Sequence, residues 1–496
     1  MHGKYGGRKK HGRQATHRSG HAVLDCEVSG GLHEGLTIDA NEDPATPSVD
    51  PGSTRLHNAL PSSVLNRLRV SLRALRHRNL RLFFAGQGVS LVGSWMQHVA
   101  ISWLAYELTG SALILGLIGF ANQIPIFIVA PFAGALGDRW SRYRMVVTAQ
   151  FAAMLQAVVL ATLVLSGSIE VWHLVALSAV AGLISGVDIP VRQALMVRLV
   201  AGKDDLPNAI ALNSSMFNSA RLVGPAIAGV LIGWVGEGPI FVINAVSYLC
   251  VLGALAAIQL ADEPGERAGP VLQNIAQGFT YAFRFVPIRD LLTLLALVSL
   301  VGLPYVVLLP VFARDILGGG AGTLGLLTSS AGFGAVIGAL RLASRSTVVG
   351  LGRLIVRAGL MFGVTLIAFA FSEAVWLSCV LLVASGSALM VVTASINTML
   401  QTLVDEAMRG RVMSLYTMAF IGMSPVGSLV GGAIATRVGA PIAVALGGLG
   451  CLALALWFRW RLPPLREIVY PAYERMGILP EVARGLHTAT TFRPKN

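Results

Sequence analysis

The stretch GALGDRWSRYR, residues 134–144, decides the fold of this chain through its position in the sequence. It joins two long apolar runs, residues 112–136 and 145–166, and each run is long enough to cross a bilayer as a helix. A tight turn with one acid and three arginines between two such helices is costly unless it lies at an aqueous face and its charges form defined pairs. The stretch therefore predicts a connection between two membrane spans.

Composition indicates a polytopic membrane protein. The chain has 496 residues, of which 54% are hydrophobic and 13% charged, and its mean hydropathy is +0.68. A soluble domain carries about 25% charged residues. The net charge of +13 comes from arginines at the ends of apolar runs, without a basic domain that carries interleaved aromatics, so we expect no nucleic-acid partner.

Twelve apolar runs predict an all-α protein with twelve transmembrane helices. The longest polar gap, residues 261–289, follows the sixth run and divides the spans into two bundles of six. The runs are residues 82–106, 112–136, 145–166, 171–199, 208–235, 239–260, 290–313, 323–343, 353–372, 376–402, 411–436 and 440–460.

The remaining segments complete the predicted domain organisation. Residues 1–60 have little apolar periodicity and are expected to be a disordered tail. Residues 61–81 place six arginines among leucines, which is typical of an amphipathic helix on an anionic leaflet. The full order is tail 1–60, basic segment 61–81, N-terminal bundle 82–260, cytoplasmic linker 261–289, C-terminal bundle 290–460 and tail 461–496.

The placement of basic residues predicts the orientation. Connections after odd-numbered spans hold mostly acids, with Arg314 (next to Asp315) and Arg437 as exceptions. Both termini are therefore expected in the cytoplasm of a bacterium, with the spans in its cytoplasmic membrane. Connections after even-numbered spans hold Arg139, Arg142, Arg144, Lys203, Arg341, Arg345, Arg353, Arg409 and Arg411.

The two halves resemble each other in sequence. Residues 106–125 (YELTGSALILGLIGFANQIP) parallel 313–332 (ARDILGGGAGTLGLLTSSAG), and each pairs a connection with the opening of an even-numbered span. Residues 219–236 (SARLVGPAIAGVLIGWVG) parallel 419–439 (AFIGMSPVGSLVGGAIATRVG), with a proline among small residues. Such repeats are typical of transporters, in which the substrate site lies between the repeated bundles.

Charged residues inside the spans are the candidates for proton coupling: Asp188, Arg192 and Arg221. Asp188 and Arg192 stand four residues apart on one helix face and are expected to pair. At ~1.5 Å per residue, Asp188 lies about 25 Å from the outer end of its span. It is the best candidate for a proton-binding carboxylate. Alternatively, Asp188 and Arg192 only anchor the cytoplasmic end of the fourth span.

Polar stripes on two further spans predict the walls of a substrate cavity. The alternative for any one of these residues is a hydrogen bond between helices, which Ser, Asn and Gln commonly form in membranes. His98 is expected to be a packing residue. The stripes are Ser214, Asn218 and Arg221 in the fifth span, and Gln87, Ser90, Ser94, Gln97 and Ser102 in the first, with Asn122 and Gln123 of the second as weaker additions.

The C-terminal half lacks these charges, since Val392 and Ile396 stand in the register of Asp188 and Arg192. Its more apolar surface favours a hydrophobic or amphipathic organic substrate. No phosphate-binding loop, HExxH motif or nucleophile elbow is present, so the chain is not expected to be an enzyme, to use ATP, or to hold a metal or cofactor. The four cysteines form no disulfide or metal-binding pattern.

Several motifs together resemble the major facilitator superfamily, in the branch with the enterobactin exporter and the transmembrane secretion effectors. They are GALGDRWSRYR (134–144), VDIPVRQA (187–194), LPNAIALNSSMFNSARLVGPAIAG (206–229) and LPVFARDILGGGAGTLGLL (309–327), together with RNLRLFFAGQGVSLVGSWMQHVAISWLAYELTGSA (78–112).

The resemblance implies a monomeric exporter that is driven by the proton gradient and works by alternating access. It implies that Gly134, Asp138, Arg139 and Arg142 form a cytoplasmic gate. It also likens Gly224 and Pro225 to a signature of antiporters, with small-residue packing as the alternative. The chain departs from the family in two places: Ser178 stands where many drug antiporters have an arginine, and residues 341–353 (RLASRSTVVGLGR) lack the acid of the corresponding loop.

Two alternatives to export stay open. Within transport, the chain could be an importer or a lipid-handling facilitator. From a different class, it could be a non-transporting membrane scaffold or a secretion accessory whose tail recruits a partner.

Overall fold

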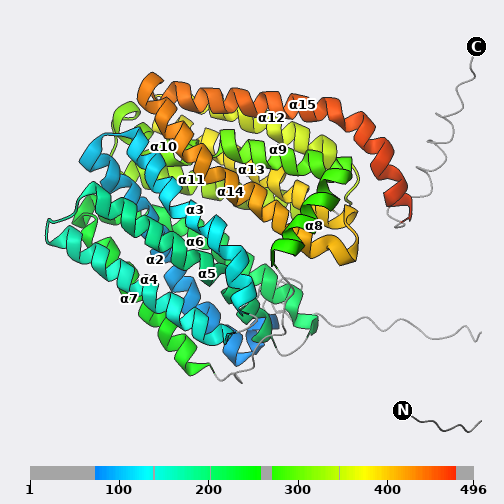
Figure 1. Ribbon diagram of the computed structural model, residues 1–496. Coiled ribbons are helices and arrows are strands. Elements are labelled where there is room, and N and C mark those ends of the chain that lie inside the picture. Colours follow the sequence, from blue (N-terminus) through cyan, green and yellow to red (C-terminus); the bar gives the residue numbers. More distant parts are fainter. Residues whose placement is uncertain (1–72, 138–139, 201–202, 259–270, 346, 476–496) are drawn as a thin grey trace, which may run out of the picture. The chain divides into compact units, whose positions relative to one another are not determined.

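The computed structural model describes residues 73–137, 140–200, 203–258, 271–345 and 347–475, all within one unit of the chain (Figure 1). The predicted tail 1–60 lies outside the described residues. The first half contains η1 (Arg73–Arg76), η2 (Lys203–Asp205) and six long helices. These helices are α2 (Arg78–Thr109), α3 (Ala112–Gly137), α4 (Arg142–Leu165), α5 (Val171–Arg198), α6 (Leu206–Val235) and α7 (Gly238–Ala257).

The second half repeats this arrangement with a preceding helix and one interrupted span. The preceding helix is α8 (Val271–Arg284), and the interrupted span comprises α9 (Val286–Gly302), α10 (Tyr305–Val311) and η3 (Phe312–Ile316), a π-helical turn. The remaining helices are α11 (Ala321–Ala343), α12 (Leu351–Ala370), α13 (Val375–Leu403), α14 (Glu406–Val438) and α15 (Ala440–Arg475).

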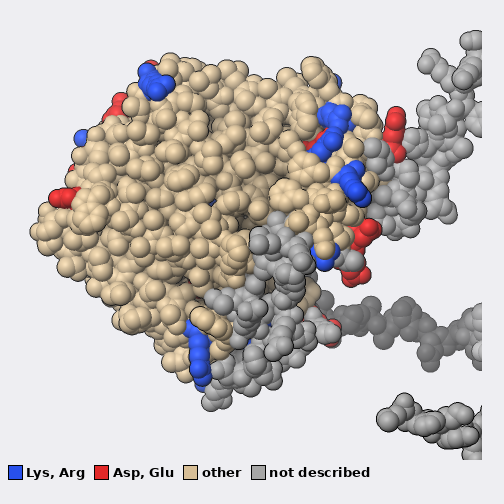
Figure 2. Space-filling model, in the orientation of Figure 1, with Lys and Arg blue, Asp and Glu red and all other residues tan. Residues whose placement is uncertain are grey.

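The helix content confirms the all-α, twelve-span prediction. Among the described residues, 11 segments are long and apolar enough to cross a membrane, and α9 through η3 count as one of them. Helix α2 is the twelfth: its 32 residues would span about 48 Å at 1.5 Å per residue. Its arginines, glutamines and histidine lower its hydropathy. Figure 2 shows charged side chains towards both ends of the helices and an uncharged band between them.

Three boundaries differ from those expected. The linker 261–289 contains the helix α8. The seventh span is interrupted between Gly302 and Tyr305, where Pro304 has no backbone N–H to donate to the preceding turn. Helix α15 continues to Arg475, past the predicted end at residue 460, because Leu465 and Val469 are buried against the bundle.

The helices end on two sides of the bundles, which we call the Gly110 end and the Asp205 end. The Gly110 end carries the connections around residues 110, 167, 236, 318, 372 and 439, and the Asp205 end carries those around residues 140, 200, 260, 346 and 405.

The halves touch mainly through two helix pairs, α3 with α14 and α6 with α11 (Figure 1). Glycines allow the backbones to approach closely near the Gly110 end. A Cβ atom on Gly116 would lie 2.5 Å from the Ser428 carbonyl oxygen, and one on Gly229 would lie 2.9 Å from that of Ala321. These distances are shorter than ordinary van der Waals contact, so larger side chains there would separate the halves.

Candidate functional site

The charged pair predicted in the fourth span lies in the interior of the N-terminal half. Asp188 of α5 is 8% exposed, and its Oδ2 atom lies 3.0 Å from Nε of Arg192. Its Oδ1 atom accepts a hydrogen bond of 2.9 Å from the Gln150 side chain of α4. The carboxylate thus has a cation at one oxygen and an amide donor at the other. An ionised acid inside a membrane requires such a charged partner and hydrogen-bond donor to offset the cost of its removal from water.

A chain of amides crosses the same interior. Asn244 of α7 donates to Oε1 of Gln97 at 2.8 Å, and Nε2 of Gln97 donates to Gln156 of α4 at 3.1 Å. Gln156 in turn donates to the Leu177 carbonyl of α5 at 3.3 Å. Gln97, a predicted cavity residue, therefore joins helices within one half, which is the alternative that the sequence left open.

The rest of the α2 stripe borders this polar interior. Ser94 of α2 shares a hydrogen bond of 3.2 Å with the hydroxyl of Tyr248 of α7. Gln87 is 3% exposed and Ser90 is also buried. Among the described residues, neither Oε1 of Gln87 nor the Ser90 hydroxyl has a hydrogen-bond partner. The polar core thus retains free hydrogen-bonding capacity.

A second cluster lies where α2 meets α6, and we call it the Trp95 cluster: Trp95, His98, Phe217 and Arg221. The Arg221 guanidinium carbon lies 5.9 Å from the centre of the Trp95 ring. The Phe217 and His98 rings lie 5.9 and 5.8 Å from that ring. The half-buried Arg221 has no carboxylate within ion-pair distance in the part of the chain that the structure describes.

The Trp95 cluster adjoins the contact between the halves. Ser329 of α11 donates to the Leu222 carbonyl at 2.8 Å, and a Cβ atom on Gly332 would lie 3.2 Å from the Arg221 carbonyl oxygen. Sequence reasoning proposed Arg221 but not Trp95 or Phe217, and it treated His98 as packing. The i, i+4 spacing of Phe217 and Arg221 was the available signal.

The other predicted cavity residues are separated from this cluster or bonded locally. Asn218 donates to the Ser214 carbonyl of its own helix at 2.8 Å, and Ser214 is exposed. Asn122 donates to the Ser178 carbonyl at 3.3 Å, which joins α3 to α5, and Gln123 is half-buried.

The predicted gate is only partly described. Gly134 belongs to α3 and Arg142 begins α4, after the N-cap Ser141. Asp138 and Arg139 lie outside the described residues.

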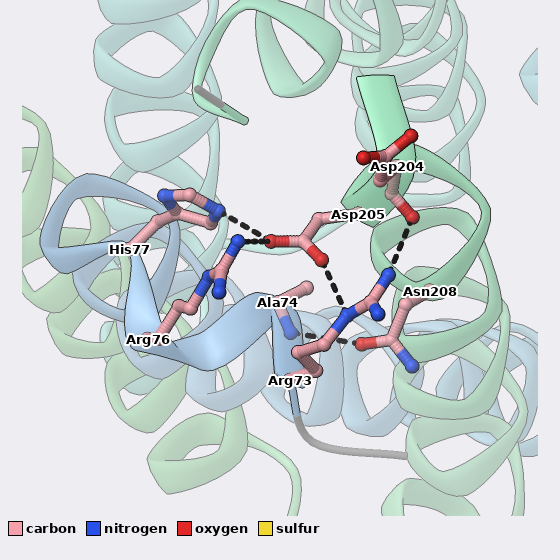
Figure 3. A network of polar contacts seen from close by, with 7 residues as sticks. All are labelled: Arg73, Ala74, Arg76, His77, Asp204, Asp205 and Asn208. Carbon is pink, nitrogen blue, oxygen red and sulfur yellow. Dashed lines mark hydrogen bonds and ion pairs between the residues drawn. The ribbon is translucent and has the colours of Figure 1, made fainter. Parts of the chain in front are cut away.

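A third cluster at the Asp205 end ties the segment before α2 to the start of α6 (Figure 3). The Asp205 carboxylate is 0% exposed and lies 2.6 Å from Arg73 Nε, 2.8 Å from Arg76 Nη2 and 2.8 Å from His77 Nε2. Arg73 also donates to the Asp204 carbonyl at 2.7 Å.

These contacts correct one expectation and perturb one pKa. Arg73 and Arg76 belong to the segment predicted as an amphipathic helix on an anionic leaflet, but they pair with Asp205, because a buried carboxylate requires nearby donors. The hydrogen bond from His77, helped by the charges of Arg76 and Arg73, lowers the pKa of Asp205 against the opposing effect of burial.

The C-terminal half has fewer contacts at the corresponding place. Asp405 precedes α14 as Asp205 precedes α6, and it accepts one hydrogen bond of 3.1 Å from the Tyr281 hydroxyl of α8. A separate acid, Asp290 of α9, is buried between Arg461 at 2.8 Å and Arg289 at 3.3 Å.

At the Gly110 end, a polar contact crosses between the halves. The Tyr106 hydroxyl of α2 donates to the Asp315 carboxylate of η3, and the Arg314 guanidinium carbon lies 6.0 Å from the centre of the Tyr106 ring. The sequence had singled out Arg314 and Asp315 only as an exception to the charge pattern. Nearby, burial and the charge of Glu107 raise the pKa of Glu237.

Two six-helix halves that meet through glycine-lined helix pairs, with polar clusters inside the bundle, define a membrane transporter of the major facilitator type. Residues 70–487 match the family described as transmembrane secretion effector, so the chain belongs to that family. It is a multi-pass secondary transporter, not an enzyme.

Three proteins with similar sequences are named as a transporter or as efflux proteins. The chain is 24% identical to the staphyloferrin A transporter of Staphylococcus aureus, over 76% of this chain and 95% of that protein. It is 25% identical to the multidrug efflux pump Tap of Mycolicibacterium fortuitum, over 72% and 87%. It is 25% identical to macrolide efflux protein A of Streptococcus pyogenes, over 41% and 50%.

Two solved transporter structures have the same fold as this chain. A POT family transporter in complex with 5-aminolevulinic acid aligns with a TM-score of 0.66 at 10% identity, over 78% of this chain and 96% of that one. A bacterial homologue of the iron transporter ferroportin, in an inward-facing state, aligns with a TM-score of 0.58 at 18% identity, over 77% and 98%.

Proposed function

We propose that this transporter exports a small hydrophobic or amphipathic organic compound, siderophore-like or drug-like, in exchange for protons by alternating access. The relatives named for siderophore transport and for drug or macrolide efflux support this substrate class. The apolar C-terminal half supports it as well, because Val392 and Ile396 are buried where the other half has Asp188 and Arg192.

Proton coupling rests on one observation, the acid Asp188 in the polar core. Its carboxylate accepts one hydrogen bond from the Gln150 amide and pairs with one arginine, Arg192. Protonation would release Arg192 from its partner, which is a way to link proton binding to movement of α5. Ser94 and Tyr248 extend the polar core towards α2 and α7.

Alternating access rests on the contacts near the Gly110 end. The backbone approaches at Gly116 and Gly229 and the contact between Tyr106 and Asp315 hold the halves together there. We propose that the Asp205 end faces the cytoplasm, on the distribution of basic residues. The loop with Gly134, Asp138, Arg139 and Arg142 would then be the cytoplasmic gate of a monomeric carrier in the bacterial cytoplasmic membrane.

Vesicles of opposite orientation test the proposal. An exporter accumulates a drug-like probe such as ethidium in inverted vesicles when the lumen is acidified, and dissipation of the pH gradient stops the accumulation. Uptake by right-side-out vesicles would instead favour an importer or a lipid-handling facilitator. Absence of gradient-driven movement in both orientations, with a panel of dyes and macrolides, would contradict proton-driven export.

A further inference from the structure

An unpaired arginine in the middle of a membrane span needs an explanation. Arg221 lies midway along α6, and its closest described partner is the ring face of Trp95 at 5.9 Å. A contact with an aromatic face offsets only part of the cost of placing a guanidinium away from water. The positive charge of Arg221 is therefore available to bind an anion.

A second unsatisfied group lies on the opposite half. Tyr305 begins α10, which contacts α2 and α3 across the boundary between the halves. Its side chain is 1% exposed, and its hydroxyl has no hydrogen-bond partner among the described residues. Its ring packs against that of Phe362 in α12, with the ring centres 6.3 Å apart. A buried hydroxyl without a partner is costly and uncommon, so a ligand oxygen that accepts its proton would be stabilised.

The surroundings indicate what the rest of the ligand is like. Trp95 packs edge-on against Phe217, which is 44% exposed, and the exposed His98 adjoins the other side of Trp95. These rings offer an apolar surface beside one fixed positive charge. The combination suits a compound with an aromatic or other flat apolar body and an acidic group.

We propose that Arg221, Tyr305 and the Trp95 cluster form a binding site for an organic anion, in which Arg221 binds the acidic group of the substrate. The proposal rests on the transport function above and adds a preference for amphipathic acids within its substrate class. Arg221 then selects substrates, rather than sharing the proton with Asp188. A guanidinium presents several donors in a fixed fork, so carboxylates are its natural ligands.

A pair of probes that differ only in charge tests the proposal. Radiolabelled 1-naphthylacetate and the neutral 1-naphthylacetamide are measured by equilibrium dialysis on the full chain in nanodiscs at pH 7, without a pH gradient. We expect the acid to bind at least tenfold more tightly than the amide. Equal affinity of the two probes, preference for the amide, or binding of neither probe would each overturn the proposal.

Variants of Arg221 and Tyr305 test whether these residues cause the preference for the acid over the amide. Arg221→Gln should abolish the preference for the acid, Arg221→Lys should keep part of it, and Tyr305→Phe should weaken acid binding several-fold without affecting the amide. The matched control is Arg437→Gln, which removes an exposed arginine from α14 and should leave both affinities unchanged. A preference that survives Arg221→Gln would refute the site.

The experiment also separates a variant that does not fold from one that has lost the site, and loss of the anion site from loss of export. If Arg221→Gln does not fold, as judged by its melting temperature, the Arg221→Lys and Tyr305→Phe variants decide, and an unaltered preference in both contradicts the proposal. Because binding is measured without a gradient, loss of the anion site leaves proton-driven export of ethidium to be judged separately in vesicles. Failure of export, with acid selectivity intact, would refute the transport mechanism alone.

Discussion

Helices α6 and α14 occupy equivalent places in the two halves and carry different chemistry. Pro225 follows Asp205 at the same distance of 20 residues at which Pro425 follows Asp405. Within this shared frame, Arg221 of α6 corresponds to an isoleucine in α14. The repeat therefore preserves the backbone features that shape a helix and not the side chains that carry charge.

The same asymmetry extends to the neighbouring helices. Asp205 is surrounded by three cationic or ionisable groups, whereas Asp405 has one tyrosine hydroxyl. The Asp188–Arg192 pair of α5 corresponds to buried aliphatic residues of α13. Among the residues that the structure describes, the ion pairs of α5 and of Asp205 thus have no counterpart at the equivalent positions of the second half, whose buried acid Asp290 lies elsewhere, and variants of equivalent positions can test what this difference does.

The largest effect is expected from Asp188→Asn. The amide keeps the shape of the side chain but cannot titrate, so accumulation driven by a pH gradient should be abolished, while substrate binding and some downhill exchange persist. Ethidium accumulation in inverted vesicles measures this, alongside the melting temperature. A purely structural role predicts instead a loss of stability that Arg192→Gln partly restores, and full accumulation by a stable Asp188→Asn protein would exclude Asp188 as the proton site.

The next largest effect is expected from Asp138→Asn in the 134–144 loop. The corresponding loop of the second half has arginines but no acid, so only the first can form a gate through an acid. Transport should fall at least tenfold, with expression and melting temperature nearly unchanged. The matched variant Arg345→Gln in the other loop should retain most transport. Normal transport by a well-expressed Asp138→Asn protein would reduce this loop to a determinant of orientation.

Thermal stability should separate Asp205 from Asp405. Asp205→Asn removes the buried carboxylate that pairs with the exposed Arg73 and Arg76, so the melting temperature should fall by several degrees. Asp405→Asn loses one hydrogen bond to a tyrosine and should have a smaller effect. Differential scanning fluorimetry of both variants provides the comparison, and equal losses would mean that the Asp205 cluster stabilises the protein no more than the single hydrogen bond of Asp405 does.

The pH dependence of stability provides a further test of the Asp205 cluster. The pKa of Asp205 is lowered from 3.8, so the folded chain holds this carboxylate ionised more firmly than the unfolded chain does. The resulting stabilisation is complete above pH 3.8 and is lost as the pH falls through the lowered pKa. Melting temperatures of Asp205→Asn should therefore decline less steeply below pH 3.8 than those of wild type, and equally steep declines would contradict this.

The smallest effect is expected at Glu237, between α6 and α7. Burial and the neighbouring charge of Glu107 raise its pKa above 4.5, so the folded chain favours the protonated acid and loses stability as the pH rises through the raised pKa. Glu237→Gln should therefore slightly raise the melting temperature at pH 7 and flatten its decline with pH. Glu373→Gln, at an exposed site of the same end, is the control, and an equal change in both variants would contradict this.

The sequence by itself determined the class of protein, the number of spans and the repeat. Hydropathy is a property of each segment on its own, so apolar runs and their charged connections could be read without knowing the packing. The pairing of Asp188 with Arg192 was also predictable, because residues four apart on a helix share a face. The interruption at Pro304 and the extension of α15 were missed, since they depend on which neighbours bury those residues.

Only the tertiary structure decided which polar side chains meet. Gln97 was expected to line a cavity, yet it bonds to Asn244 and Gln156, which lie far from it in sequence. The partners of Asp205 and the position of Arg221 against Trp95 were equally hidden. A helical stripe specifies a face, but the rotation and packing of twelve helices determine whether that face meets its own bundle, the other half or a ligand.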